Sequence, residues 1–213
     1  MDPGWLSNAY LVADEEGGTA LVVDSGAPIE PLLAAAERWR VKPEHLLRTH
    51  ADPDHVAHEN ELGVTVITRS LETGGLRVEA LPTPGHSADH LAFVVNDELC
   101  FSGDILFRDA VGGGRDVPAI RRSVMDVLMG LPHDMRVLPG HTDETTIGRE
   151  WEANPFVRYW RGLDPEGDEP CRVGGEDATI VVDSPDYDGK GKLLVRFADG
   201  REAIVGGSRV TSG

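Results

Sequence analysis

The stretch THADPDH (residues 49–55) places four metal-binding side chains within six residues. It follows a short apolar run, so we expect it where a buried strand opens into a loop. Alternate residues of extended backbone project to one side, which predicts a common side for His50, Asp52 and Asp54. A turn at Pro53-Asp54 then brings His55 into the same cavity. Imidazole and carboxylate groups at this density indicate a site for a divalent cation.

Three later segments repeat this arrangement, each with a potential ligand just after an apolar run. They are PGH (84–86), GD (103–104) and PGH (139–141). A glycine in each allows the backbone to approach a crowded centre. The candidate ligands are therefore His50, Asp52, Asp54, His55, His86, Asp104 and His141. Seven ligands are too many for one zinc ion and suit two ions that share a carboxylate.

Hydrophobic periodicity predicts two similar halves, each with strands and helices. The expected strands are 8–13, 19–24, 46–49, 64–68, 76–81, 91–96, 99–102 and 137–138, and the expected helices follow Pro28 or span 117–131 and 145–153. Two sheets face to face, with helices outside, satisfy this order. An acidic, Pro/Gly-rich segment then precedes β-type runs at 178–183, 192–197 and 202–205. We predict a main domain over 1–163, a linker over 164–170 and a small β-rich appendage over 171–213, which leans on the main domain or on a second subunit.

Composition narrows the class of protein. The chain has 213 residues, 40% of them apolar, enough for one medium domain with an appendage. A formal charge of -17 disfavours nucleic acid and anionic membranes as partners. The sequence has no stretch of transmembrane length, no signal-peptide pattern at its start and only two cysteines. We therefore expect a cytoplasmic protein with a small-molecule substrate, and a homo-oligomer through the appendage is compatible with the sequence.

The four segments together resemble the metallo-β-lactamase superfamily and, within it, the glyoxalase-II-like hydrolases. The family motifs correspond here to residues 49–55, 84–86, 103–107 and 139–150, in order, within roughly residues 8–158. The resemblance implies an α/β (α+β) fold, the four-layer αββα sandwich, with the site at one edge of the paired sheets. It does not extend over the appendage, which does not look like the helical glutathione-binding extension of glyoxalase II.

The resemblance also implies a role for each ligand. The first metal takes His50, His86 and residue 52, the second takes Asp54, His55 and His141, and Asp104 bridges the two. The implied cofactors are two divalent ions, with zinc first and iron or manganese as alternatives. The implied reaction is hydrolysis of a thioester or related carbonyl compound by a bridging hydroxide, with Asp54 as the catalytic residue that orients it.

Asp52 is the clearest departure, because the family has histidine there. Three carboxylates and one hydroxide balance two divalent cations, whereas histidine at position 52 would leave one positive charge in excess. A less positive centre lowers the pKa of bound water less. A carboxylate ligand also shifts preference toward manganese or iron(II). A second departure is Ala57-His58, where the family has two glycines.

Other residues near the motifs have weaker functional interpretations. His58 and Arg115 are candidates for the substrate rim, and Trp5 for the pocket border. His90 is expected to pack or to hydrogen-bond behind the site. The glycines at 112–114 lack the Lys-Ser/Thr of a phosphate-binding loop, so we expect them to shape the rim.

Two other functions remain open from the sequence. One is a mononuclear-iron sulfur (persulfide) dioxygenase, whose motifs are closely similar; iron content and persulfide-dependent oxygen uptake distinguish it from a hydrolase. The other is a non-catalytic descendant in which Asp52 marks decay of the site. Failure to bind metal would favour that interpretation, and the retention of the six other ligands argues against it.

Overall fold

The first of three β-sheets contains the N-terminal hairpin. The computed structural model describes residue 4 and residues 6–212, so Trp5 lies outside the described residues. The strand order is β1-β2-β3-β4, with bounds Tyr10–Ala13, Thr19–Val23, Lys42–Leu47 and Thr65–Ile67. β1 and β2 pair antiparallel, and the other neighbours pair parallel. Helix α1 (Glu30–Trp39) covers the outer face, where Ala36 packs on Ala20.

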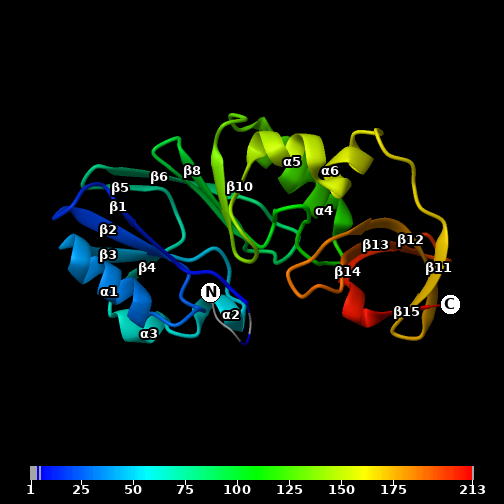
Figure 1. Cartoon of the computed structure of the whole chain (residues 1–213), viewed down its shortest axis with the longest axis horizontal. Helices are drawn as coiled ribbons and strands as arrows, with labels where there is room; N and C mark the ends of the chain where they lie inside the picture. Colours follow the sequence, from blue (N-terminus) through cyan, green and yellow to red (C-terminus); the bar gives the residue numbers. More distant parts are fainter. Residues whose placement is uncertain (1–3, 5, 213) are drawn as a thin grey trace.

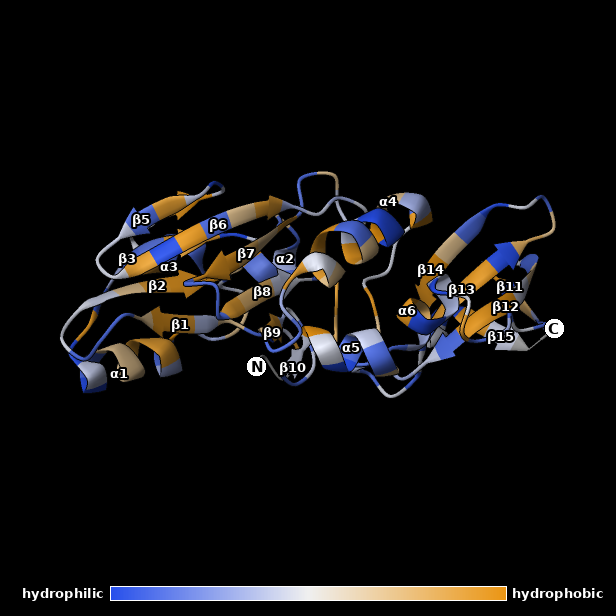
Figure 2. Ribbon diagram, turned by 90° about the horizontal axis from the view of Figure 1, so that it is seen from above, coloured by the Kyte–Doolittle hydropathy of each residue, from blue (hydrophilic) through white to orange (hydrophobic). Residues whose placement is uncertain are grey.

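The second sheet has the order β10-β9-β8-β7-β6-β5. From β5 to β10 the bounds are Leu71–Thr73, Leu76–Pro82, Leu91–Val95, Leu99–Gly103, Arg136–Pro139 and Thr145–Thr146. The first and last of these strands were not predicted; they are only three and two residues long. Leu21 and Val23 of the first sheet pack against Phe93 and Phe101 of the second, which places a core between the sheets. Strands at the centre of the molecule are accordingly largely apolar (Figure 2).

Helices cover the outer face of the second sheet. α4 (Val117–Arg122) continues as a π-helical turn over Ser123–Val127 and a 3-10 turn over Leu128–Gly130. α5 (Ile147–Ala153) ends before Asn154, whose side chain then caps α6 (Pro155–Trp160). α6 was not predicted. Together with α1 and the two sheets these helices form the four layers of the predicted αββα sandwich (Figure 1).

The C-terminal segment forms a third, antiparallel sheet at the opposite end of the molecule from α1 (Figure 1). Its strands are β11 (Glu169–Val173), β12 (Glu176–Ser184), β13 (Lys192–Phe197), β14 (Glu202–Gly206) and β15 (Val210–Ser212). Side chains of β12, β13 and β14 join the apolar cluster of the helices, so this sheet packs on the αββα layers. β11 begins inside the predicted linker, and the domain boundaries themselves stay a prediction.

The loop after β3 differs from expectation. Pro53–Val56 forms a short helix, α2, and Glu59–Leu62 forms α3. The expectation of extended backbone through Asp54 is therefore wrong: Asp52, the residue before α2, is extended, but Asp54 and His55 lie in the helical turn. None of the helices among the described residues is long and apolar enough to span a membrane.

Candidate metal centre

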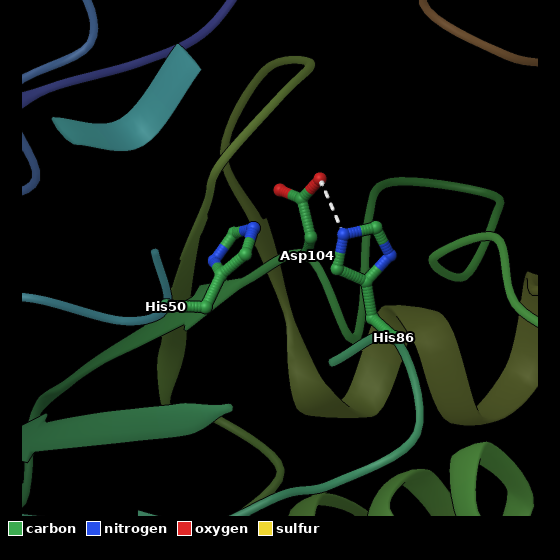
Figure 3. Close-up of side chains that lie close together, drawn as sticks. All are labelled: His50, His86 and Asp104. Carbon is green, nitrogen blue, oxygen red and sulfur yellow. Dashed lines mark ion pairs between the residues drawn. The ribbon is translucent and has the colours of Figure 1, made fainter. Parts of the chain in front are cut away.

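The structure gathers the predicted ligands into two adjacent groups at one edge of the paired sheets. His50, His86 and Asp104 form the first group; each offers a ligand atom within 4.8 Å of the others (Figure 3). The second group, by the same measure, contains Asp54, His55 and His141. Asp104 also lies 3.3 Å from both His55 and His141, so its carboxylate stands between the groups.

Distances in the second group suit a shared cation. Nε2 of His141 lies 3.4 Å from Asp54 Oδ2 and 3.3 Å from Asp104 Oδ2. Nε2 of His55 lies 3.3 Å from Asp104 Oδ1 and 3.9 Å from Asp54 Oδ2. Two ligands of a tetrahedral zinc ion, each about 2.0 Å from the metal, are themselves about 3.3 Å apart. These ligand atoms are thus spaced as in a coordination shell.

Asp52 lies on the solvent side of the first group. Its Oδ2 atom is 3.2 Å from Nε2 of His86 and 3.7 Å from Nε2 of His50. Its side chain is 51% exposed, whereas the side chain of His50 is fully buried. Asp52 therefore comes within ligand spacing of both histidines, from the open side of the site.

The four histidines share one orientation. Each Nδ1–H donates to a protein acceptor, and Nε2 is left to face the centre. The acceptors are Thr49 Oγ1 for His50, Asp24 Oδ2 for His55, Gly113 O for His86 and Leu6 O for His141, at 2.8–3.0 Å. Hydrogen bonds of this kind fix the tautomer and the ring orientation of metal-binding histidines.

Asp24 is a functional residue that the sequence reasoning missed. It is buried at the end of β2, and its Oδ2 atom accepts both from His55 and from the hydroxyl of Thr49, each at 2.8 Å. Because Thr49 in turn accepts from His50, one carboxylate orients a histidine in each group. No local motif marks Asp24; its partner His55 is 31 residues away.

Unpaired atoms indicate that these residues suit a metal. Among the described residues, Nε2 of His50, Nε2 of His55 and Oδ1 of Asp104 are buried without a hydrogen-bond partner. Each such atom costs about 1–3 kcal/mol of folding free energy if nothing satisfies it. His55 and Asp104 are 3.3 Å apart, yet they are not aligned for a hydrogen bond. Cations bound by the two groups would satisfy all three atoms.

The electrostatics of the site also favour a cation. Burial alone would lower the pKa of His55, but Asp104 and Asp24 raise it overall to about 11. The pKa of His141 rises to about 9, because Asp104 and Asp54 outweigh its burial. Burial would raise the pKa of Asp104, yet His141 and His55 hold it well below its usual value. The carboxylates thus create a negative potential that stabilises positive charge, carried by protons or by metal ions.

Two glycines keep space open beside the ligands. A Cβ atom on Gly140 would overlap Asp104 Oδ1 and lie 2.6 Å from Cε1 of His55. Gly103 has φ +49°, and a Cβ atom there would lie 2.7 Å from Nε2 of His90. Side chains at these two positions would displace the groups that orient or form the site.

The residues with weaker predictions lie at different places. His90 is buried behind Asp104; its Nε2 accepts from the Asp104 backbone N–H at 2.9 Å, as expected for a residue behind the site. His58 instead pairs with Glu61 at 2.8 Å, outside both groups. Arg115 lines a cleft of about 1200 Å³ that includes His86 and Asp104. Gly113 and Gly114 line the same cleft, so the glycine segment shapes its rim as predicted.

Comparisons with known proteins support the interpretation of this geometry. A family model of the metallo-beta-lactamase superfamily matches residues 2–58. A solved structure titled TTHA1623 in a di-iron-bound form is 30% identical, with a TM-score of 0.60, and the match covers 73% of this chain and 98% of that one. The chain belongs to the metallo-β-lactamase superfamily.

Two further similarities fall within this superfamily assignment. The hydroxyacylglutathione hydrolase GloC of Haemophilus influenzae is 26% identical over 196 residues, which cover 70% of this chain and 92% of that protein. The structure of ETHE1 from Myxococcus xanthus is 25% identical with a TM-score of 0.63, covering 71% of this chain and 80% of that one. Each match leaves more than a quarter of this superfamily member uncovered.

Proposed function

We propose that this protein is a metal-dependent hydrolase with two metal ions, and that it cleaves a thioester or a related carbonyl compound. The observation that carries the proposal is the pair of ligand groups around one shared carboxylate, Asp104. The similarity to a hydroxyacylglutathione hydrolase favours a thioester substrate. We assign His50, Asp52 and His86 to one ion, Asp54, His55 and His141 to the other, and Asp104 to both.

Two divalent ions bound there would supply a Lewis acid for the carbonyl oxygen and would lower the pKa of a water molecule between them. Each ion would then have two histidines and two carboxylates, with Asp104 counted for both, a ligand set that suits zinc and also accepts iron or manganese.

Asp54 is the candidate for orienting the attacking water. Its side chain is 27% exposed, so it remains accessible to water while Oδ2 lies 3.4 Å from Nε2 of His141. The neighbouring His141 lowers the pKa of Asp54, so the carboxylate is ionised at neutral pH and can accept a proton. The proton passes from water to Asp54 and then to the departing thiolate. Water and thioester thus yield a carboxylic acid and a thiol.

A substrate panel with metal analysis tests this proposal. Protein purified from metal-replete medium is expected to hold about two ions per chain. It is expected to hydrolyse at least one member of a panel of hydroxyacyl-glutathione thioesters, lactones, β-lactams and phosphoesters. Less than about one ion per chain, or no turnover with the whole panel, would contradict it.

Asp54→Asn tests the role of the carboxylate. We expect a loss of turnover of about 10²–10⁴-fold, the usual contribution of a general base, with the folded state retained. Circular dichroism and metal content check the fold and the site. Full activity in this variant would show that the water is oriented by another group.

A mononuclear-iron persulfide dioxygenase is the second candidate. The observation that favours it is the composition of the first group, two histidines and one carboxylate, the ligand set of many non-haem iron(II) oxygenases. Iron in the first group together with oxygen consumption on a persulfide substrate would select this function. Thioester turnover without oxygen uptake would select the hydrolase.

A further inference from the structure

The loop between β12 and β13 (residues 185–191) reaches the metal centre from the C-terminal sheet. In Figure 1 it projects from the third sheet toward the middle of the molecule. The ring of Tyr187 on this loop stacks on the ring of His141, with centroids 4.1 Å apart and planes 11° apart. A segment outside the family motifs thus touches a predicted metal ligand.

Tyr187 is held firmly in this position. Its ring meets Phe107 edge-on at 6.1 Å. Beneath it Lys192 forms a buried ion pair with Asp186 at 3.0 Å, and the ammonium lies 5.3 Å from the centre of the Tyr187 ring. Cation–π and aromatic contacts both stabilise this placement of the ring. These contacts favour the stacked position of the ring on His141.

A second link joins the C-terminal sheet to the glycine segment that lines the cleft. Gly114 and Ile204 of β14 exchange backbone hydrogen bonds of 2.9 and 2.8 Å. The carbonyl of the neighbouring Gly113 accepts from His86. The third sheet therefore fixes both rims: Tyr187 beside the second group and the glycine segment beside the first.

Tyr187 also separates two cavities. It lines the cleft of about 1200 Å³ that includes His86 and Asp104, and it lines a smaller cavity of about 290 Å³ beside Leu6 and Thr142. Its side chain remains 37% exposed although one face covers His141. A ligand in the cleft can therefore contact this ring as well as His86 and Asp104.

We propose that the C-terminal sheet forms one wall of the active site and that Tyr187 is a specificity-determining residue, packing against an apolar acyl group of the substrate. The inference deepens the proposed hydrolase function and rests on it. The ring offers an apolar surface, and the glycine segment opposite leaves room for an acyl chain. The buried Lys192–Asp186 pair serves to position the ring.

The affinity of the protein for straight-chain carboxylates, from acetate to octanoate, tests whether Tyr187 contacts the acyl group. The measurement requires no catalytic turnover. These acids are product analogues; isothermal titration calorimetry on the metal-loaded protein measures their affinity. For the wild type we expect affinity to rise as the chain lengthens, by at most about fourfold per buried methylene. Tyr187→Phe is expected to show the same dependence of affinity on chain length as the wild type. Tyr187→Ala should bind hexanoate and octanoate about three- to tenfold more weakly, with acetate unchanged.

Trp39→Ala is the matched control. Trp39 is 39% exposed, close to the exposure of Tyr187, and lies on α1 at the other end of the molecule. The Trp39→Ala variant should bind every acid with the wild-type affinity. Identical affinities in wild type and Tyr187→Ala would overturn the proposal. So would an equal loss for acetate and octanoate, because Tyr187 would then act through His141.

A cobalt(II) absorption spectrum separates these two roles. If Tyr187 contacts the acyl group, Tyr187→Ala keeps the wild-type cobalt spectrum and loses only the chain-length dependence. A changed spectrum would assign the residue to positioning His141 and would overturn the acyl contact. Because the acids require no turnover, these measurements are informative even if the thioester panel fails, and failure of that panel contradicts the hydrolase alone.

Discussion

The two ligand groups differ mainly in Asp52, an exposed carboxylate that lies beside the first group. In the second group the side chains of His55 and His141 are at most 1% exposed, and they donate to Asp24 and to the Leu6 carbonyl. Asp54 of the same group is 27% exposed. In the first group His50 is fully buried and His86 is 19% exposed, and Asp52 beside this group is 51% exposed. The departure from the family motif lies at this open side. A ligand there can change without leaving a buried polar group unpaired, so metal preference can vary in the first group while the second stays constant.

The largest expected effect breaks both groups at once. Asp104→Ala removes the carboxylate that lies near histidines of both groups. We expect metal content to fall from about two ions to below one per chain, and turnover to fall by on the order of 10³-fold or more. Elemental analysis and thioester assays measure this. The exposed Asp134→Ala is the control, and two tightly bound ions in Asp104→Ala would refute the shared role.

Two variants distinguish the two ligand groups by changing Asp24 or Thr49, the residues that orient the ligand histidines. Asp24→Asn disturbs the acceptor of His55 and, through Thr49, that of His50. Thr49→Val removes only the hydroxyl on which His50 depends. Loss of such supporting groups weakens metal binding by roughly 10–100-fold. In competition with a chelator, we expect Asp24→Asn to weaken both ions and Thr49→Val only one.

Asp14→Asn is the matched control, because Asp14 also accepts backbone N–H groups but lies on the exposed hairpin. Asparagine at position 24 should also tolerate the positive φ of 53° found there. Equal weakening of both ions by Thr49→Val would contradict the separation of the groups.

Features of the site that depend only on neighbouring residues could be predicted from the sequence. A short apolar run followed by glycine and a ligand is readable from neighbouring residues, and each such segment does end a strand at one edge of the sheets. The fold class followed from the order of these segments and the resemblance they carry. The seven candidate ligands do lie together, although their binding of metal stays a prediction.

Features that depend on distant partners could not be predicted. Asp24 looks like an ordinary strand end until His55 is placed beside it, and Tyr187 looks like a loop residue until it stacks on His141. α6 was missed for a different reason. The residue before a proline disfavours helical backbone, which is why the predicted helix ends at residue 153. Proline is also favoured at the first position of a new helix, and here Pro155 begins α6, capped by Asn154.

Restoring the family residue sharpens the contrast in metal preference. Asp52→His replaces a carboxylate with imidazole, which suits zinc better than manganese. We expect the zinc-to-manganese affinity ratio of the first group to rise by about tenfold, with the second group unchanged. Metal competition followed by elemental analysis measures the ratio. Asp52→Asn, which removes charge at constant size, should weaken the first group, and an unchanged ratio in Asp52→His would mean that Asp52 is not a ligand.

The smallest expected effect is a pH dependence that belongs to the second group of the metal-free protein. There the pKa of His141 is raised to about 9 and that of His55 to about 11. A histidine whose folded pKa exceeds the unfolded value of about 6.5 adds stability that is complete below pH 6.5 and is lost as pH rises through the folded pKa. The Tm of metal-free protein should therefore fall between pH 6.5 and 9, by on the order of 5 °C. Metal-loaded protein holds these Nε2 atoms without protons, so its Tm should decline less over that range. If Tm fell equally with pH in the metal-free and the metal-loaded protein, the carboxylates would not be holding protons on these histidines.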